Sequence, residues 1–449
     1  KTLLLEKAVI GGGVSAGNTG LACTLLDIQH GSVEEHCLRR ALRVNTRLHA
    51  ALGIPLVPCG ALYTAWTSQE QMQLAALASS VEAAEARSGT TPQSAVQSSV
   101  LQTEEVLQRE PRLSKGVLGG VLVAGEVLVD PGLVPLAYAA DALARGADLA
   151  EHAEVNRVAQ VPSSLHSSYW KVTWSKEGQV AETKAERIVN CGGLSADVVE
   201  GCAEQMLGTT STLRFRPRRG NYLILRAPTQ TEQPVLSCPI GSVPMAGARG
   251  VYVWTTIHGD VAVGPTNIEQ ASKDLPLAAP HDIAALRNRA VEVCPALAAW
   301  QPIAVYSGLR PALERDAWGS DYVIQRALGA GSWVTVAGIR STGLTASLGI
   351  ADRVADVLVG CDSQSPLLED QASTKQVAAL PSLPHLRQMF QDSNDGSLLL
   401  HGRRFHVSHP ITRLGLASPG FPPSRSPGGG GSAMWLMSEL PWRNSFCSG

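Results

Sequence analysis

The stretch Lys1-Thr2-Leu3-Leu4-Leu5-Glu6-Lys7 is the most informative about the fold, because an apolar run that ends on an acid is typical of a strand in a nucleotide-binding sheet. In a βαβ unit that binds a dinucleotide, an Asp or Glu at the end of the second strand hydrogen-bonds the ribose hydroxyls, about 20 residues after a glycine-rich phosphate turn. Glu6 has only five residues before it. We therefore expect a flavin or nicotinamide enzyme whose first strand, phosphate turn and helix precede this sequence.

The composition is that of an ordinary globular protein. The chain has 449 residues, of which 44% are hydrophobic and 17% charged, and its formal net charge is −2. This length allows two domains and a tail. A nearly neutral chain has no electrostatic field that would favour nucleic acid or an anionic membrane, so we expect no nucleic-acid partner.

The nine cysteines are scattered along the chain without a C-x-x-C pair, which indicates reduced thiols rather than disulfides or a zinc site. No metal site is expected. Charged residues, Gly or Pro interrupt every apolar run before it reaches the roughly 18 residues of a membrane span. We expect an intracellular protein without a transmembrane segment, cytoplasmic or mitochondrial depending on a targeting segment ahead of Lys1.

Hydrophobic periodicity predicts the order of the elements. A loop at 11–24 precedes a helix at 32–52, which the Ser32 and Glu35 pair would cap and Gly53 would end. Further helices are expected at 68–88, 133–145, 281–293, 344–358 and 386–390, and strands at 54–66, 118–129, 155–161, 169–174, 186–191, 222–225, 251–255, 261–263, 333–336 and, as a hairpin, 398–400 with 404–407. The strands from 222 to 336 are expected to form one curved antiparallel sheet.

Two motif matches lack the structural context that would give them meaning. Residues 11–16 fit the pattern G-x-G-x-x-A, but Gly17 and Gly20 interrupt the helix that a dinucleotide turn must open. Residues 13–17 fit G-x-S-x-G, but a hydrolase elbow needs several strands before it. Neither a phosphate turn nor a nucleophilic serine is predicted here.

A third interpretation accounts for this loop. Leu5-Glu6-Lys7 is followed by Ser15-Ala16-Gly17-Asn18-Thr19-Gly20, and further motifs follow in a fixed order: Val129-Asp130-Pro131, Val189-Asn190-Cys191-Gly192-Gly193, Arg219-Gly220-Asn221-Tyr222, Val263-Gly264-Pro265-Thr266, Gly308-Leu309-Arg310-Pro311 and Gly338 to Leu344. In these motifs and their order the chain resembles FAD-dependent oxidoreductases of the D-amino-acid-oxidase-like superfamily. Within it, the chain is most similar to the branch of glycerol-3-phosphate dehydrogenase and L-2-hydroxyglutarate dehydrogenase.

The resemblance implies an α/β fold with a split FAD-binding domain, Rossmann-like and of the glutathione-reductase type, and an inserted α+β substrate domain with an antiparallel sheet. The FAD-binding domain would comprise residues 1–52, 115–212 and 337–361, without its first βα unit. The substrate domain would comprise residues 53–114 and 213–336. Residues 362–417 would form a small C-terminal appendage, and the Pro, Ser and Gly-rich residues 418–449 a disordered tail.

The resemblance also implies FAD as the cofactor. The start of the 344–358 helix would stabilise negative charge on the flavin with the positive end of its dipole. The residues expected to contact FAD are Glu6, Lys7, Ser15, Gly17, Asn18, Gly20, Leu21, Val155, Gly192, Gly193, Gly338, Gly343, Leu344 and Thr345.

Arg310 is the predicted substrate-binding residue, because its planar guanidinium suits a carboxylate or phosphate. The alternative is an ion pair with Glu314 or Asp316. Arg219 and Arg340 are weaker candidates and are expected to be structural.

No catalytic residue is assigned. Cys23 stands where relatives usually carry a His, and it could be a small apolar filler or a thiol that faces the flavin. His258 and His281 are expected at the surface.

The predicted function is oxidation of a small anionic hydroxy substrate, of the glycerol-3-phosphate or 2-hydroxy acid type, by hydride transfer to flavin N5. The electron acceptor stays open among oxygen, a quinone and a protein. One alternative is an amine or amino-acid oxidase on the same scaffold. The other is an inactive fragment or pseudoenzyme that cannot hold FAD, since the first βα unit would supply the pyrophosphate site.

Overall fold

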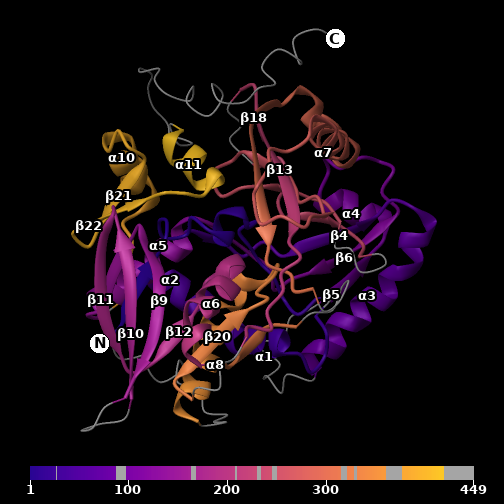
Figure 1. Cartoon of the computed structure of the whole chain (residues 1–449). Coiled ribbons are helices and arrows are strands. Elements are labelled where there is room, and N and C mark those ends of the chain that lie inside the picture. The colour runs from indigo at the N-terminus through magenta and orange to yellow at the C-terminus, as the bar shows by residue number, and fades with distance from the viewer. Residues whose placement is uncertain are drawn as a thin grey trace.

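The computed structural model describes residues 1–26, 28–86, 98–162, 168–207, 210–229, 234–244, 250–314, 321–327, 331–360 and 377–418. Within these ranges the strands form six sheets, and helices cover them in a mixed α/β arrangement. Figure 1 shows the magenta strands β9 to β11 on one side of the molecule, the helices α3 and α4 on the other, and the yellow C-terminal elements above the magenta strands. The helices of this part of the chain include none that is both long and apolar enough to cross a membrane.

The largest sheet has nine strands, and its neighbours are antiparallel except for β4 and β14. Its strands are β4 (Ala61–Ala65), β5 (Ser98–Leu101), β6 (Gly119–Val123), β13 (Arg218–Arg226), β14 (Ile240–Ser242), β15 (Tyr252–Thr255), β16 (Val261–Gly264), β17 (Ile268–Glu269) and β18 (Gln301–Arg310). The helices beside it are α3 (Ser68–Ala86), α4 (Thr103–Arg109), α7 (Pro280–Val293) and η3 (Pro295–Ala299).

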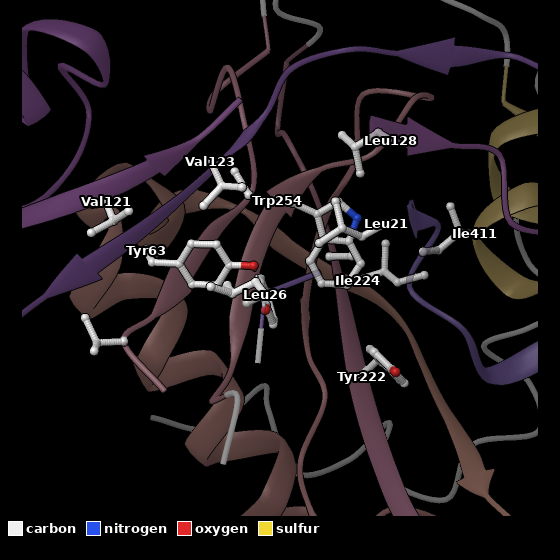
Figure 2. Packing of buried hydrophobic residues seen from close by; sticks show 14 of the residues in the cluster. Leu21, Leu26, Tyr63, Val121, Val123, Leu128, Tyr222, Ile224, Trp254 and Ile411 are labelled. Atoms are coloured by element: carbon white, nitrogen blue, oxygen red, sulfur yellow. Dashed lines mark hydrogen bonds between the residues drawn. The ribbon is translucent and has the colours of Figure 1, made fainter. Parts of the chain in front are cut away.

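This sheet is buried on both faces. Side chains alternate along a strand, so Tyr63 and Leu62 of β4 point to opposite faces. Tyr63 packs with Trp254 and with residues of α3 in one hydrophobic cluster (Figure 2), whereas Leu62 packs with α4 and α7 in another. Burial on both faces explains why β4 reads as an uninterrupted apolar run apart from Thr64.

The other sheets have two or three strands each. β1 (Leu3–Glu6) pairs in parallel with β8 (Asp148–Glu151), and β9 (Ala153–Val161), β10 (Tyr169–Lys176) and β11 (Gln179–Ala185) form an antiparallel sheet. Two three-stranded sheets contain β12 (Ile188–Asn190) with β20 (Trp333–Ala337) and β19 (Val323–Arg326), and β2 (Leu21–Ala22) with β7 (Val127–Val129) and β3 (Leu56–Val57). The helices near these smaller sheets are η1 (Val14–Gly17), α1 (Val33–Leu42), α2 (Asn45–Ala51), α5 (Leu133–Ala144), η2 (Gly193–Ser195), α6 (Ala196–Leu207) and α8 (Gly343–Val359).

The predicted helix at 32–52 is two helices, α1 and α2, divided at Arg43 and Val44. The Ser32 hydroxyl caps α1 as expected, by accepting the Glu35 N–H at 3.0 Å. The Glu35 carboxylate does not close the capping box, because it accepts the N–H of Gly31 and pairs with Arg39 instead. The predicted helix at 344–358 is confirmed as α8, which packs closely on α1.

Sheet membership departs from the expected domain boundaries in two places. Trp333–Ala337 does not extend the antiparallel sheet, as the expectation for 213–336 required. It pairs in parallel with β12. Conversely, Gly119–Val123 was assigned to the FAD-binding part, but it pairs with β4 and β5 in the nine-stranded sheet. Alternating apolar residues predict a strand but not its partner, so the expected sheet membership of residues 333–336 is wrong, while the domain boundaries stay predictions.

The C-terminal elements share a core with the rest of the molecule. They are α10 (Leu383–Asp392), the hairpin β21 (Ser397–Leu400) and β22 (Arg403–His406), and α11 (Pro410–Ala417), which the periodicity did not indicate. Leu386 and Phe405 are fully buried in one cluster with Leu133 and Leu136 of α5. The predicted tail, apart from Ser418, and residues 361–376 lie outside the described residues.

Candidate functional site

A cavity of about 2360 Å³ lies between the glycine-rich loops and one side of the nine-stranded sheet. Small-molecule pockets usually have volumes of about 300–1,000 Å³, so this one has room for a larger ligand or for two ligands. One side, which we call the loop wall, is formed by Glu6–Lys7, 11–18, 191–195, 338–341 and 343–344. The other side, which we call the sheet wall, is formed by Arg218, Tyr222, Tyr252, Trp254, Thr266 and Arg310.

The two walls meet where Gly17 contacts Gly308 of β18. A Cβ on Gly17 would lie 2.4 Å from the Gly308 Cα, and one on Gly308 would lie 2.6 Å from the Gly17 Cα. Only two glycines allow backbones to approach this closely. This contact fixes the glycine loop, which includes η1, against the end of the nine-stranded sheet.

Asn18 holds the shape of the glycine loop. Its side-chain amide donates to the Ser15 carbonyl at 2.6 Å, and its side-chain oxygen accepts the Gly20 N–H at 2.7 Å. Gly20 adopts a positive φ of 74°, and a Cβ there would lie 2.6 Å from the Val129 carbonyl oxygen. The asparagine and the glycine therefore act on backbone geometry, which explains why this motif has small and amide residues.

Glu6 and Lys7 lie at the end of β1, on the cavity. One Glu6 carboxylate oxygen accepts the Ala8 N–H at 2.8 Å, and the Lys7 ammonium pairs with Glu154. The carboxylate position at the end of a parallel strand is the one at which a nucleotide ribose is bound in doubly wound folds.

The loop wall continues with the turn after β12 and the start of α8. The buried Asn190 orders the turn, because its side chain accepts the Gly192 N–H at 3.0 Å and donates to the Ala196 carbonyl at 2.8 Å. Gly193 has a left-handed φ of 56°. Gly343 and Leu344, the first residues of α8, also line the cavity, so the positive end of this helix dipole lies at the loop wall.

The structure places twelve of the fourteen predicted FAD contacts on the cavity. The two others, Gly20 and Thr345, do not line it. They support the wall from behind, Gly20 through its turn and Thr345 by accepting the Cys23 N–H on its hydroxyl at 3.1 Å. The residues that line the cavity are Glu6, Lys7, Ser15, Gly17, Asn18, Leu21, Val155, Gly192, Gly193, Gly338, Gly343 and Leu344.

Arg310 lies at the end of β18 on the sheet wall, directly opposite Arg218 of β13 in the strand register. The Arg310 guanidinium donates to the Thr266 carbonyl at 3.4 and 3.5 Å. Arg218 donates to Glu269 at 3.4 Å. Two cations from neighbouring strands at one edge of a cavity are suited to an anion. Of the proposed carboxylate partners of Arg310, Glu314 also lines the cavity and Asp316 lies outside the described residues.

Arg340 and Arg219 each have a carboxylate nearby, as expected for structural residues. Arg340 lies 3.4 Å from Glu34, and Arg219 lies 3.9 Å from Asp282. Cys23 lies on the cavity, and its thiol donates to the Leu21 carbonyl at 3.5 Å. Both interpretations of Cys23, an apolar filler and a thiol that faces a ligand, agree with this position.

The expectation that His258 lies at the surface is wrong. Its side chain is buried, and Nε2 lies 2.6 Å from the Asp130 carboxylate. The turn between β15 and β16 carries His258 beneath α11, where Gly415 leaves room for the imidazole. Burial alone would raise the pKa of Asp130, but the hydrogen bond and charge of His258, with the Thr412 hydroxyl, hold it below its usual value. His281, in contrast, is exposed as expected.

The sequence did not identify the aromatic residues of the sheet wall. The Tyr222 ring stacks on Tyr306 at 4.4 Å and meets Trp254 edge-on at 6.5 Å. Tyr252 and Trp254 are two residues apart on β15, so they lie on the same face. That spacing was the available signal, but it did not say which face the cavity would adjoin.

The residues present fit a dinucleotide. Main-chain groups of glycine turns, a carboxylate at a strand end and a helix N-terminus surround one side of the cavity, and a Cβ on Gly13 would meet no atom within 4 Å. Among the residues that the structure describes, no group of three or more His, Cys, Asp or Glu could hold a metal ion.

Comparison with known proteins agrees with this geometry. Residues 1–357 match the model of the DAO family, FAD dependent oxidoreductase. Glycerol 3-phosphate dehydrogenase of Caloramator mitchellensis is 27% identical over 262 residues, which cover 58% of this chain and 50% of that protein. The chain thus spans about half the length of that relative.

Many solved structures share the fold, among them the following two. One is L-alpha-glycerophosphate oxidase from Mycoplasma pneumoniae with FAD bound, at a TM-score of 0.68 and 22% identity over 80% of this chain and 88% of that chain. The other is glycine oxidase from Geobacillus kaustophilus, at a TM-score of 0.64 and 22% identity over 83% of this chain and 92% of that chain. With the family match over residues 1–357, the conclusion is that this chain belongs to the DAO family of FAD-dependent oxidoreductases.

Proposed function

We propose that this chain binds FAD against the loop wall and oxidises a small anionic hydroxy compound, of the glycerol 3-phosphate or 2-hydroxy acid type, at the sheet wall. When bound, FAD accepts at N5 the hydride that leaves the substrate carbon. The observation that carries the proposal is the placement of Arg310 and Arg218 on the same cavity as the glycine loop.

The loop wall supplies the cofactor contacts in this proposal. The Glu6 carboxylate at the end of β1 would accept the ribose hydroxyls. Gly17 and Asn18, with the turn at Gly192 and Gly193, would bring main-chain groups close to the ligand. The first turn of α8 would favour negative charge next to it.

The sheet wall supplies the substrate contacts. The Arg310 guanidinium would bind the substrate phosphate or carboxylate in a fork, with Arg218 as a second cation across the strand pair. Tyr222 and Trp254 would exclude water beside the reacting carbon. Orientation and binding of the anion are the contribution of the protein, and they bring the reacting C–H bond to the cofactor.

A second candidate is oxidation of an amine or amino acid. The fold of glycine oxidase, an enzyme that by its name acts on glycine, covers as much of this chain as that of the glycerophosphate oxidase. A carboxylate of an amino acid would bind the same guanidinium. The preference for a hydroxy substrate rests on the similarity to glycerol 3-phosphate dehydrogenase.

The test is a visible spectrum of the purified chain after FAD is added and the excess removed. Glycerol 3-phosphate, L-2-hydroxyglutarate and glycine are then added in turn without oxygen. We expect a retained yellow colour that one of the two hydroxy compounds bleaches. Bleaching by glycine alone would support the amine oxidase, and a folded but colourless protein would contradict FAD binding by this chain.

A further inference from the structure

The C-terminal helix α11 begins at a histidine that is bonded to the glycine loop. His409 is the N-cap residue of α11 and is 1% exposed. Its Nε2 atom lies 3.0 Å from the main-chain carbonyl oxygen of Asn18, and its Nδ1 atom lies 3.2 Å from the main-chain nitrogen of Ile411. One imidazole therefore joins the start of α11 to a loop that lies 391 residues earlier in the chain.

The direction of these two hydrogen bonds follows from the chemistry of the groups. A main-chain N–H can only donate, so Nδ1 of His409 accepts the Ile411 N–H and carries no proton. A carbonyl oxygen can only accept, so Nε2 carries the ring proton and donates it to Asn18. Burial lowers the pKa of His409 to about 4, which keeps the ring neutral at pH 7 with this single proton.

The Asn18 carbonyl receives a second donor from the nine-stranded sheet. The Tyr306 hydroxyl of β18 donates to it at 3.3 Å. The Tyr306 and His409 rings also contact each other, with their centroids 5.5 Å apart. Neither of these two residues lines the cavity. Both donors therefore belong to the support of the loop wall and not to its surface.

Fixing this carbonyl also fixes the peptide unit that contains it. A peptide bond is planar and trans, so the Thr19 N–H points opposite to the Asn18 carbonyl. Asn18 and Thr19 both line the cavity. His409 and Tyr306 therefore set the orientation of a peptide unit in the wall that we propose to contact FAD.

The residues on either side of His409 lie close to the same loop. A Cβ on Gly11 would lie 3.5 Å from the Ser408 hydroxyl oxygen. Ile411 packs in one hydrophobic cluster with Leu21 (Figure 2). α11 lies outside residues 1–357, the part of the chain that matches the family. A segment beyond the family match thus supports the glycine loop.

We propose that His409 is a positioning residue for FAD, which holds the Asn18–Thr19 peptide in the orientation that the bound cofactor requires. The inference rests on the proposed function, because it takes the loop wall as the cofactor site. His409 does not touch the cofactor and takes no part in proton transfer. It acts through the Asn18 carbonyl, with Tyr306 as a second donor to the same oxygen.

Two substitutions separate the two hydrogen bonds of the imidazole. His409→Asn keeps a side-chain oxygen for the Ile411 N–H, since asparagine is a preferred N-cap residue, but it is too short to reach Asn18. His409→Gln can place an amide N–H near the position of Nε2, but glutamine is not a preferred N-cap residue. We expect His409→Asn to weaken FAD binding about tenfold, through the loss of one buried hydrogen bond, and His409→Gln to restore most of the affinity. Titration of the flavin-free chain with FAD, followed by flavin fluorescence, measures both affinities.

The second donor gives a further test. Tyr306→Phe keeps the ring and removes only the hydroxyl, and we expect it to weaken FAD binding about threefold. In the double variant with His409→Asn, the loss should exceed the product of the two single losses, because only then does the Asn18 carbonyl lose both side-chain donors. Independent effects in the double variant would contradict a shared acceptor.

The matched control is Leu416→Ala. Leu416 is fully buried in α11, in a cluster that does not include the glycine loop residues Asn18 and Leu21. The substitution removes apolar packing from the same helix but leaves both hydrogen bonds of His409. We expect a lower melting temperature with an unchanged FAD affinity, measured where the variant is folded. An affinity loss equal to that of His409→Asn would mean that helix stability, and not the Asn18 bond, determines FAD binding.

A second readout needs no FAD. In the flavin-free chain with isotope-labelled histidine, the nitrogen NMR signals show which ring nitrogen carries the proton, and His409→Asn identifies the signals of this residue. We expect a protonated Nε2 and an unprotonated Nδ1 at neutral pH. A proton on Nδ1 would overturn the assignment of both hydrogen bonds.

The outcomes separate this role from the proposed function. If His409→Asn binds FAD as tightly as the unmodified chain, or if His409→Gln loses as much affinity as His409→Asn, the positioning role is wrong and the proposed function stands. If FAD binds with the expected order of affinities but no hydroxy substrate bleaches it, the proposed substrate is wrong and the positioning role stands. If the unmodified chain does not bind FAD, both fail.

Discussion

The loop wall and the sheet wall differ in what they present to the cavity. The loop wall offers mainly main-chain groups, from glycine turns at 11–13, 192–193 and 338. The sheet wall offers side chains, the guanidinium of Arg310 and the rings of Tyr222, Tyr252 and Trp254. A wall made of backbone suits a ligand that is large and constant, such as a dinucleotide. A wall made of side chains can change with the substrate while the fold is kept.

The largest expected effect comes from removing a buried carboxylate that ties the sheet side of the molecule to α5 and α11. The Asp130 carboxylate, just after β7, is hydrogen-bonded to the His258 imidazole from the sheet side. It also accepts the main-chain N–H of Gly132 and the hydroxyl of Thr412 in α11. We expect Asp130→Asn to lower the free energy of unfolding by about 3–5 kcal/mol at pH 7, because three buried hydrogen bonds lose a charged acceptor and each such bond contributes about 1.5–3 kcal/mol. Denaturant unfolding measures this change.

Two measurements check the role of Asp130: the pH dependence of the unfolding free energy, and the effect of breaking an exposed ion pair. Since the folded pKa of Asp130 is lowered, its stabilisation is present above its unfolded pKa and is lost as the pH falls through the folded value, below about 3.9. The variant should lack this loss. Asp148→Asn, which breaks the exposed pair with Lys1, should cost about 0–1 kcal/mol. Equal costs for the two variants would contradict the role of Asp130.

The contact between the walls is the next way to test the comparison. Gly308→Ala places a Cβ 2.6 Å from the Gly17 Cα, so two backbones must separate. We expect a loss of about 1–3 kcal/mol in unfolding free energy and a weaker retention of FAD. Calorimetry and the flavin absorbance after gel filtration measure both.

The control for this glycine is Gly201→Ala in α6, where a Cβ meets no atom within 4 Å. Replacing a helical glycine by alanine should stabilise by at most about 1 kcal/mol. If Gly308→Ala behaved like Gly201→Ala, the two walls would not be joined at this contact.

A substitution confined to the sheet wall should leave the loop wall intact. We expect Arg310→Ala to raise the KM for a hydroxy substrate about 30-fold or more, the loss of a charge-assisted pair worth about 2 kcal/mol, while FAD retention is unchanged. Arg326→Ala, which removes a guanidinium that donates to the Val357 carbonyl away from the cavity, should change neither. Loss of FAD in Arg310→Ala would mean that the two walls do not act separately.

The smallest effect at neutral pH concerns two buried histidines behind the loop wall. Burial lowers the pKa of His49 to about 4, and the pKa of His409 also to about 4, from 6.5. Both are neutral in the folded protein, so the unfolded chain takes up protons first as the pH falls. Stability should fall between pH 6.5 and 4, by up to about 1.4 kcal/mol per pH unit for each histidine.

Melting temperatures over this pH range measure the effect. His49→Gln should remove part of the acid sensitivity, whereas His281→Gln should leave it unchanged, because His281 is 84% exposed. An unaltered pH dependence in His49→Gln would mean that this histidine is not buried in its neutral form.

The loop wall was easier to predict from the sequence than the sheet wall, because it is built from local backbone turns and the sheet wall from side chains of distant strands. Glycine motifs are local, so the family and the fold were predicted correctly from residues 5–20, 189–193 and 338–344, and most residues predicted to contact FAD line the cavity. The split of the 32–52 helix was missed, because its apolar spacing continues through the break at Arg43 and Val44. The place of His258 was missed because α11, which the periodicity did not reveal, packs over it.

The sequence by itself determined the class of fold, the FAD family and the glycine turns, because turn geometry and strand ends depend on residues that are neighbours in the chain. Tertiary structure alone decided which strands pair, as with β20 and β12, and which side chains face one cavity. It also brought Asn18, Tyr306 and His409 together from three separate segments. The alternation of apolar residues indicates which side chains share a face of a strand. What covers each face depends on contacts between residues far apart in the sequence.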